Sequence, residues 1–546
     1  MMSTNIPPFP EDIPVLIVGG GLVGLSTSLC LAHYGARSLL VERHAGTTIH
    51  PKQFGLGIRP MEIFRSLGLE KAVQAGGADL AHARDHLVVQ TLVAGAIRRN
   101  RMLDTDNPQI QALSPSMLTV CPQNILEPLL LDAARQRGAD IRFNTELLSF
   151  TQDEEGVTAT LVERATGERR TVRAAYLVAA DGAHSPISRS LDIPRRGAGT
   201  FAHMVNIYFR ADLRSLIGEQ SFAVCVVMNP EAFGVLGPVN SRDLWIFNAG
   251  FAPERGERLE DFTEERCIDL VRKAVGLPDL AVEVISVLPW EMAARAAERL
   301  VAGRVFIAGD AAHVMPPVGG FGASTGIQDA QNLAWKLALV LRGLAGPELL
   351  KTYESEREPV NWFTTEQARL RYQEANRRWS ADAGKRGEVG MAHDLVVMLG
   401  YHYISPAIVE PRRQMPSLEQ VVLDGEPGTR APHLWIERAG QRLSTLDLLG
   451  QRFVLLAGPA GASWLSAART VAERLGLDLD LYRAGTDFSA GDGAFCTAYG
   501  ITPQGAVLVR PDGFVGWRSA ADDGQAEETL TRVFAQLLQR AYPPGE

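Results

Sequence analysis

The clearest pattern in the chain is a short apolar run that ends in glycines and is followed by a helical segment. Residues 15–18 (VLIV) form the first run, and residues 22–33 are predicted to be a helix. Between them stand three glycines in the spacing G-x-G-x-x-G: Gly19, Gly21 and Gly24. A second β-type run, residues 38–41, ends at Glu42. This order of strand, tight turn, helix, strand and acid predicts a dinucleotide-binding βαβ unit, in which Glu42 can accept hydrogen bonds from ribose hydroxyls.

Each glycine has its own role in such a unit. Gly19 makes the turn, Gly21 lets the backbone approach a pyrophosphate, and Gly24 lets the helix pack on the strand. The helix start at Leu22 and Val23 is expected to offer unpaired N–H groups to the same phosphates. An ordinary glycine-rich turn is the alternative, and the flanking strands and the acid disfavour it.

Two further apolar runs end in a glycine and an acid. Residues 176–180 (YLVAA) lead into Asp181, and residues 305–308 (VFIA) lead into a glycine and Asp310. Because the carboxyl ends of parallel strands form the ligand edge of a sheet, we expect Asp181 and Asp310 to face the molecule that Glu42 binds. Three acids along one edge imply a long ligand.

The segment after Asp310 combines a loop rich in proline and glycine with a long helical pattern. Apolar residues recur at helical spacing on one face: Ile327, Ala330, Ala334, Leu337 and Leu341. The polar face carries Gln328, Asp329, Asn332 and Lys336, and Gly343 can end the helix. Its start near Ala323 and Ser324 offers free N–H groups and a partial positive charge to an electron-rich ligand. Plain core packing is the alternative reading of this helix.

Taken together, GGGLVG, AADGAHS and GDAAHVMPP resemble the motifs of the group A flavoprotein monooxygenases, single-component aromatic hydroxylases that use FAD. The resemblance covers roughly residues 12–370. It implies that Asp310 and Gln123 contact the ribityl chain and that Asp181 lies near the pyrophosphate and the path of the nicotinamide donor. It also implies that Arg43 lies over the adenosine end.

The resemblance also suggests what the loop and helix after Asp310 do. Their start would stabilise the negative charge of a reduced flavin. We expect the loop to form a stiff wall against the ring system, with these cofactor-binding positions: Pro317, Gly320, Gly322, Ala323 and Ser324. Ser324 stands where relatives usually carry Asn, and Lys52 occupies a position where relatives have an arginine near the phosphates. Lysine can still pair with a phosphate, although without the bidentate geometry of arginine.

Between the second and third motifs the chain changes character. Residues 201–209, 221–228 and 243–251 are β-rich and alternating, which predicts an antiparallel sheet. Such a sheet could cover the flavin and hold a flat, largely apolar substrate on these side chains: Met204, Tyr208, Val224, Val226, Met228, Trp245 and Phe247. Each of these could equally belong to the core. His203 is the only histidine in these segments. Because a single histidine in a strand more often has a structural role than a role in proton transfer, we name no catalytic residue.

The last part of the chain predicts a further α/β unit. Its elements are a strand at 452–456, a helix at 463–475, a hairpin formed by 505–510 and 514–518, and a helix at 527–540. This order is similar to the thioredoxin-like appendage of phenol hydroxylases and aromatic polyketide hydroxylases. Cys496 has no partner cysteine nearby, so a packing or dimer-contact role is expected rather than redox chemistry.

The predicted fold class is therefore α/β, with a Rossmann-type FAD-binding domain, an inserted, mainly antiparallel β-sheet substrate domain and a thioredoxin-like C-terminal domain. The expected division has four segments: 1–190 for the first part of the FAD-binding domain, 191–290 for the substrate sheet, 291–410 for the continuation with long helices, and 411–546 for the C-terminal domain.

Composition narrows the partners and the compartment. A net charge of −9 with scattered Lys and Arg disfavours nucleic acid and anionic membranes. Five widely spaced cysteines argue against a disulfide framework or a metal site and fit a cytoplasmic protein. The apolar stretch at 15–32 follows an acidic segment and holds three consecutive glycines, which makes it a poor signal peptide or membrane span. A homodimer is a possible assembly.

The whole-chain layout most resembles the polyketide hydroxylases, which implies a fused polyphenolic substrate. In that chemistry NADH or NADPH reduces FAD, O₂ adds to the reduced ring, and an electron-rich aromatic carbon attacks the flavin hydroperoxide. With a single dinucleotide fingerprint, the nicotinamide donor is expected to reach the flavin directly. Baeyer–Villiger oxygenation, epoxidation and a non-catalytic flavoprotein that binds an aromatic compound are the alternatives.

Overall fold

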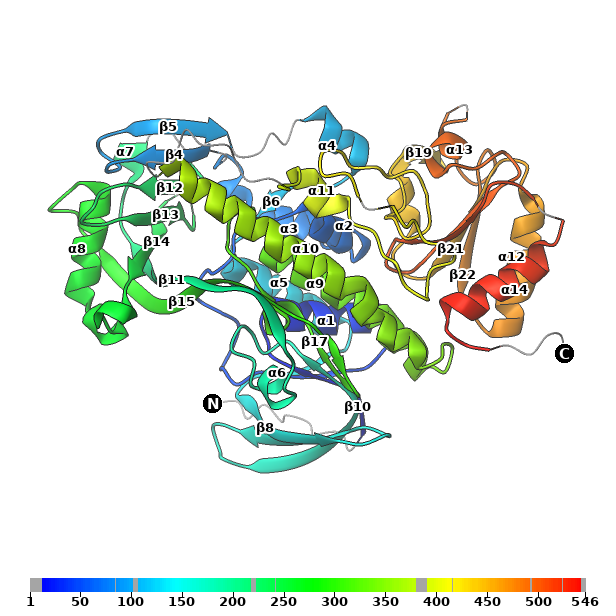
Figure 1. The fold of residues 1–546 in the computed structure, drawn as a ribbon, viewed down its shortest axis with the longest axis horizontal. Helices are drawn as coiled ribbons and strands as arrows, with labels where there is room; N and C mark the ends of the chain where they lie inside the picture. Colours follow the sequence, from blue (N-terminus) through cyan, green and yellow to red (C-terminus); the bar gives the residue numbers. More distant parts are fainter. Residues whose placement is uncertain are drawn as a thin grey trace.

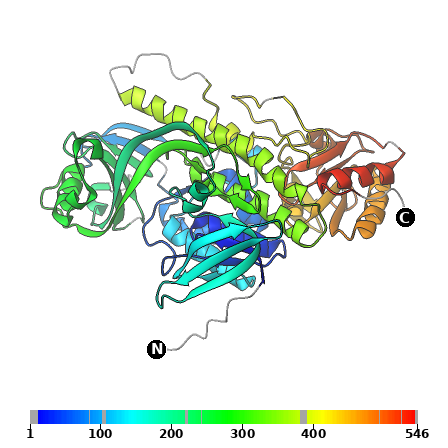
Figure 2. The ribbon, with the colours of Figure 1, turned by 60° about the horizontal axis from the view of Figure 1, so that its bottom comes forward.

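The computed structural model describes residues 12–83, 85–101, 107–217, 222–240, 242–379, 390–414, 416–491, 493–522 and 524–541. It is a mixed α/β protein with two large sheets and a smaller C-terminal sheet, as expected. In Figure 1 the parallel sheet lies at the lower centre, the antiparallel sheet at the left and the C-terminal unit at the right. The long helix α10 (Glu348–Trp379) crosses the molecule diagonally between them, and Figure 2 shows the same course from another side.

The parallel sheet has the strand order β16-β17-β10-β1-β2-β7, and all its neighbours are parallel except β16 and β17. Its strands are β1 (Asp12–Val18), β2 (Leu39–Val41), β7 (Asp140–Arg142), β10 (Arg169–Ala179), β16 (Val301–Ala302) and β17 (Val305–Ile307). The hairpin β8 (Thr145–Gln152) and β9 (Val157–Glu163) extends it along β10. Each of the four short apolar runs of the sequence lies in or directly overlaps a strand of this sheet.

Three helices pack together beside this sheet: α1 (Leu22–His33), α5 (Gln123–Gln136) and α9 (Phe321–Leu341). The prediction for α1 is confirmed at both ends. α9 is buried on all sides, because Asp329, Asn332 and Lys336 on its polar face are buried as completely as its apolar residues. Other helices of this part are α2 (Ile58–Ser66), α3 (Glu70–Gly76), α4 (Pro108–Leu113), α6 (Pro186–Ser190) and α11 (Asp394–Leu399), with the short strands β3 (Gly55–Leu56) and β6 (Thr119–Val120).

The antiparallel sheet has the order β18-β15-β11-β14-β13-β12-β4-β5, in which only the β12–β4 pair is parallel. Its strands are β4 (Asp85–Val89), β5 (Ala96–Arg101), β11 (Arg195–Arg210), β12 (Val224–Val227), β13 (Gly234–Pro238), β14 (Leu244–Phe251), β15 (Glu283–Ala297) and β18 (His313–Val314). The three β-rich segments of the sequence are strands here, although Ser221 lies outside the described residues. The sheet also takes β4, β5 and β18 from outside residues 191–290, so the expected boundaries do not enclose it.

One face of the antiparallel sheet forms a closed core against helix α8 (Glu264–Val275). Trp245 and Phe247 belong to this core, together with Val205 and Phe209, so of the two alternatives left open for them core packing is the one observed. Alternation along β14 turns Ile246 and Asn248 to the other face. The short helix α7 (Arg214–Ile217) lies at the same end of the sheet.

The C-terminal unit has a four-stranded sheet in the order β22-β21-β23-β24, with β21 and β22 parallel and the other neighbours antiparallel. Its elements are β21 (Phe453–Ala457), α12 (Ala462–Leu475), β22 (Leu479–Arg483), α13 (Ala494–Tyr499), β23 (Ala506–Val509), β24 (Val515–Ser519) and α14 (Ala526–Leu537), preceded by the hairpin β19 (Trp435–Arg438) and β20 (Gln441–Ser444). The expected strand, helix, hairpin and final helix are present in the expected order, whereas β22, α13 and the hairpin of β19 and β20 were not predicted.

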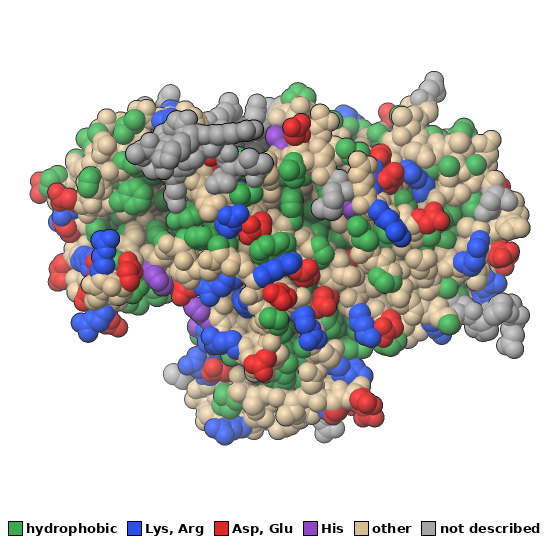
Figure 3. Space-filling model, in the orientation of Figure 1, with side chains coloured by type: hydrophobic (Ala, Val, Ile, Leu, Met, Phe, Trp, Pro, Cys, Tyr) green, Lys and Arg blue, Asp and Glu red, His purple; other side chains and the backbone are tan. Residues whose placement is uncertain are grey.

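The surface carries no sign of a single charged footprint on the face drawn in Figure 3, where acidic and basic side chains are interspersed. All five cysteines are free thiols, and only Cys496 is partly exposed. Across the described ranges, none of the helices combines the length and apolar character that crossing a bilayer requires.

The glycine turn after β1 generates the first prediction. A Cβ on Gly24 would lie 1.8 Å from the carbonyl oxygen of Gly19, whose own φ of +110° requires glycine. We expect Gly24→Ala to lower the free energy of unfolding by about 1–3 kcal/mol or more through overpacking. Denaturant unfolding of the full chain measures it. Gly250→Ala, where a Cβ meets nothing within 4 Å, serves as the control. Equal stability of the two variants would contradict the prediction.

Candidate active site

The predicted site residues follow the carboxyl ends of neighbouring parallel strands. Asp310 comes after β17, Asp181 after β10, Gly19 after β1 and Glu42 after β2, in the order in which these strands stand in the sheet. Neighbouring strands are about 4.8 Å apart, so this edge extends over about 15 Å. The structure therefore arranges the three acids along one line, as an extended ligand requires.

Backbone hydrogen bonds hold the glycine turn against the next strand. The Gly19 N–H donates to the Val41 carbonyl (2.9 Å), and the Gly20 N–H donates to Glu42 Oε2 (2.6 Å). The second carboxylate oxygen of Glu42 accepts from the backbone N–H of His44 (2.9 Å). Glu42 is thus fixed beside the turn, with its side chain 12% exposed.

The first turn of α1 brings the other motifs to the glycines. Leu22 is buried, whereas Val23 is half-buried and packs against Gly309 and Gly326 so closely that a Cβ at either glycine would lie 2.6 or 2.5 Å from its Cγ2. The start of α1, the loop that carries Asp310 and the helix α9 therefore meet at one point. This convergence joins segments almost 300 residues apart.

A buried glutamate that sequence reasoning missed also lies at the turn. Glu127 on α5 accepts from Gln123 Nε2 (2.6 Å) and from the Thr48 backbone N–H (2.8 Å). Its Oε1 would be 3.7 Å from a Cβ on Gly21. Burial raises the pKa of Glu127. The spacing of Gln123 and Glu127 by one helical turn was the only signal in the sequence.

Two of the acids at the edge carry the electrostatics expected of ligand-binding groups. Burial raises the pKa of Asp181, whose Oδ2 accepts from the Ile187 N–H (3.3 Å) and whose Oδ1 is buried without a partner among the described residues. Burial likewise raises the pKa of Asp310, against the opposing charges of His313, Lys52 and Arg195. The surface of Asp310 is exposed, and the burial that raises its pKa comes from the protein atoms gathered around its carboxylate. An unpaired buried acceptor fits a ligand that carries hydroxyl groups.

The two basic residues expected at the site, Lys52 and Arg43, differ in whether they lie near the acids. Lys52 is exposed and close enough to Asp310 and Glu127 for its charge to lower both pKa values. Arg43 is exposed directly after Glu42, and its carbonyl accepts from Arg164 (3.3 Å). The structure brings Lys52 to the acids, while no contact of the Arg43 side chain links it to them.

The start of α9 is open. Gly320 precedes the helix with a φ of +68°, and no side chain of the described residues caps its first turn. Pro317 and Gly320 are exposed, and Gly322 and Ala323 are half-buried. Ser324 is buried, and its hydroxyl accepts from the Gly57 N–H at the start of α2 (3.1 Å). Several backbone N–H groups are therefore left for a ligand at this end of the helix.

Behind the site, a fully buried ion cluster ties the Asp310 loop to both long helices. Asp329 of α9 accepts from the Gly309 N–H (3.1 Å), from His313 Nε2 (2.7 Å) and from Arg357 Nε of α10 (2.8 Å). Burial alone would raise the pKa of Asp329, but Arg357 and His313 hold it below its ordinary value. The sequence placed Asp329 on a polar helix face without indicating this role.

The second face of the antiparallel sheet is turned toward the FAD-binding part, since Phe54 from the loop after β2 packs on Tyr208 and Ile246. Met204, Val224, Val226 and Met228 are half-buried on this face, as expected for a surface that receives an apolar molecule. Asn248 accepts from Trp290 Nε1 (3.1 Å) on the same face. His203 is half-buried beside Phe251, with ring centroids 5.8 Å apart.

Comparison with known proteins explains this arrangement. Residues 12–368 match the FAD binding domain family, and residues 424–541 match the family of aromatic-ring hydroxylase C-terminal domains. The chain belongs to the FAD-dependent aromatic-ring hydroxylases. It is a flavoprotein monooxygenase, and FAD is its cofactor.

Relatives of this hydroxylase align over nearly the whole chain. The tetracenomycin A2 monooxygenase-dioxygenase of Streptomyces glaucescens is 43% identical over 97% of both chains. The 4-methyl-5-nitrocatechol 5-monooxygenase of a Burkholderia species is 41% identical over 97% of this chain and 98% of its own. A crystal structure of aklavinone-11 hydroxylase with FAD and aklavinone superposes with a TM-score of 0.88, at 38% identity over 98% of this chain and 100% of that one.

The ion cluster behind the site generates the second prediction. Asp329→Asn leaves Arg357 buried without its charge partner, which should cost about 3–5 kcal/mol of unfolding free energy at pH 7. Because the pKa of Asp329 is lowered by folding, its contribution is present above the unfolded value of about 3.9 and is lost as the pH falls through the folded value. Urea unfolding at several pH values measures both effects.

Asp329→Asn combined with Arg357→Met is the matched control for this prediction. The double variant should lose less stability than the sum of the two single variants, because neither charge is left alone. Strict additivity would contradict the pairing.

Proposed function

We propose that this chain hydroxylates a fused polyphenolic substrate of the aromatic polyketide type, using NADH or NADPH and O₂. The observation that carries the proposal is the half-buried apolar sheet face opposite the strand edge with its three acids. The relatives named for tetracenomycin and aklavinone support the substrate class. NADH or NADPH as the electron donor is typical of this family.

For the cofactor, we propose that FAD lies along the strand edge with its adenosine at Glu42 and its ribityl chain at Asp310. The unpaired Oδ1 of Asp181, the open start of α1 and the charge of Lys52 fit the hydroxyl and phosphate groups between these ends. The proposed binding residues are those named from the sequence: Gly19, Gly21, Leu22, Val23, Gly24, Glu42, Arg43, Lys52, Gln123, Asp181, Asp310, Pro317, Gly320, Gly322, Ala323 and Ser324. Glu127 joins them as a residue that orients Gln123.

Bound FAD supplies the redox chemistry, by accepting a hydride from the donor and activating O₂. The residues of the chain have other tasks. The uncapped start of α9 is placed to stabilise negative charge on the flavin ring. The apolar side chains Val224, Val226 and Met228 would orient a flat substrate and exclude water from the reacting atoms. No side chain is proposed as a base for a phenol.

The name of one relative favours a second reaction on the same scaffold. The 43% identical relative is named a monooxygenase-dioxygenase, so oxygenation beyond a single hydroxylation is the alternative on this scaffold. Baeyer–Villiger oxygenation and epoxidation give the same mass change as hydroxylation. The number of oxygen atoms and their positions in the product therefore have to be measured separately. A cytoplasmic location and a homodimer also remain proposals.

The cofactor placement predicts that Asp310→Asn weakens FAD binding. Loss of a charge-assisted hydrogen bond costs about 1.5–3 kcal/mol, which corresponds to about a 10- to 150-fold rise in the FAD dissociation constant. Titration of the apoprotein by flavin fluorescence measures it. Asp279→Asn, which removes an exposed carboxylate after α8, should bind FAD like the wild type. An unchanged affinity of Asp310→Asn would refute the placement.

The reaction itself is tested with the FAD-loaded enzyme, NADH or NADPH, ¹⁸O₂ and a panel of fused-ring polyphenols. We expect at least one of them to stimulate oxidation of the donor and to gain one ¹⁸O atom on an aromatic carbon. A single-ring catechol should be a poorer substrate, because it covers less of the apolar sheet face. Oxidation of the donor without incorporation into any polyphenol would refute the proposed substrate class.

A further inference from the structure

The turn between β23 and β24 of the C-terminal domain reaches into the FAD-binding part. Residues Pro511, Asp512 and Gly513 form its tip, and Asp512 is buried. Trp335 and Asn332 of α9 both donate to Asp512 Oδ2, from the indole Nε1 at 3.2 Å and the amide Nδ2 at 3.4 Å. The C-terminal domain thus contacts the helix whose start lies at the proposed flavin site.

Four charged side chains, which are buried from solvent, lie at this contact. Arg510 binds both oxygens of Glu356 on α10 (2.7 and 2.8 Å) and both oxygens of Asp512 (3.1 and 2.5 Å). Lys336 of α9 donates to Glu356 (2.8 Å) and to Asn332 (2.9 Å). Two cations and two anions therefore balance, and their side chains are at most 2% exposed. Such a cluster has one favourable geometry, because each charge needs its partners.

A second connection runs from the same turn to the start of α9. Arg59 of α2 donates to the carbonyl oxygen of Asp512 (2.5 Å) and to Gln331 of α9 (3.0 Å). Two residues before Arg59, the Gly57 N–H donates to the hydroxyl of Ser324 (3.1 Å). The turn is therefore linked through α2 to the first turn of α9, in addition to its direct contacts with the middle of that helix.

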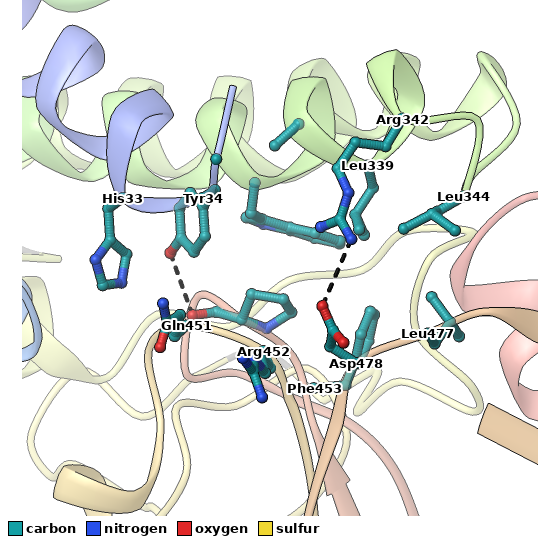
Figure 4. A pocket seen from close by; sticks show the side chains of 14 residues that line it. His33, Tyr34, Leu339, Arg342, Leu344, Gln451, Arg452, Phe453, Leu477 and Asp478 are labelled. Atoms are coloured by element: carbon teal, nitrogen blue, oxygen red, sulfur yellow. Dashed lines mark hydrogen bonds and ion pairs between the residues drawn. The ribbon is translucent and has the colours of Figure 1, made fainter. Parts of the chain in front are cut away.

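Other contacts also join the two domains, among them the ion pair of Arg65 on α2 with Asp447 (2.6 Å) and the packing of Trp335 on Phe453 of β21. A partly open recess of about 160 Å³ lies beside the turn, between the ends of α1 and α9 on one side and β21 on the other. Figure 4 shows Tyr34 donating to the Pro511 carbonyl (3.3 Å) and Arg342 pairing with Asp478 (3.5 Å) across this recess. Next to the turn, Arg510 of the C-terminal domain makes a fully buried ion pair with Glu356 of the long helix α10, which suits a contact that sets position.

We propose that the turn of the C-terminal domain positions α9 and α2, and through them the flavin-binding start of α9. Asp512 and Trp335 are positioning residues in this proposal, since neither touches the strand edge where the flavin is placed. The inference rests on the proposed location of FAD. It assigns the C-terminal domain a part in cofactor geometry rather than in redox chemistry.

The test compares Asp512→Asn and Trp335→Phe with Val507→Ala, which removes side-chain volume from the C-terminal core away from the turn. For each full-length variant, the FAD dissociation constant, the visible circular dichroism of bound flavin and the melting temperature are measured. We expect both turn variants to weaken FAD binding about 5-fold or more and to change the flavin spectrum. Val507→Ala should lower the melting temperature and leave both flavin properties as in the wild type.

A purely structural role would lower stability in all three variants alike. The proposal is overturned if the two turn variants lose thermal stability but keep the affinity and spectrum of Val507→Ala. If Asp512→Asn does not fold, Trp335→Phe decides, because it keeps an aromatic ring and removes one N–H donor. Asp310→Asn in the same titration separates the two hypotheses: if it alone weakens binding, the flavin site holds and the inference fails, and if it has no effect, the proposed site itself is wrong.

Discussion

The strand edge that carries the three acids depends on backbone segments that approach each other more closely than a Cβ atom would allow. Gly24 sits against the carbonyl of Gly19, and both Gly309 and Gly326 lie against Val23. These contacts bring the first helix, the loop with Asp310 and the helix α9 to one point. The acids at the strand ends can share one ligand only because this convergence fixes their strands and loops together.

Local signals in the sequence predicted a large part of this arrangement. The helix at 22–33 was bounded correctly because a glycine turn precedes it and a β-type run follows it, and the strand-end acids followed from the sheet rule. Local signals in the sequence could not predict which side chains are buried by segments that are distant along the chain. Asp329 looks like any polar helix residue, and its partner Arg357 is 28 residues away. Trp245 and Phe247 alternate in a strand with apolar residues on both faces, so their direction stayed open.

Similar chains in this family carry names for very different aromatic compounds. A nitrocatechol monooxygenase and a tetracenomycin oxygenase are almost equally identical to this protein over almost its full length. The scaffold therefore does not decide the size of the substrate. Under the proposed placement of the substrate, such differences arise on the half-buried face of the antiparallel sheet, for example at Met204 and Val226, because the opposite face is a closed core against α8.

The parallel pairing of β12 with β4 has a consequence for protein engineering. The strands β4 and β5 come from the stretch between α3 and α5, whereas the other strands of that sheet come from residues 195–314. A chimera made by exchanging one continuous segment would leave two strands of the original protein at the edge of the new sheet. A chimera that keeps this sheet from one parent therefore has to exchange both segments together.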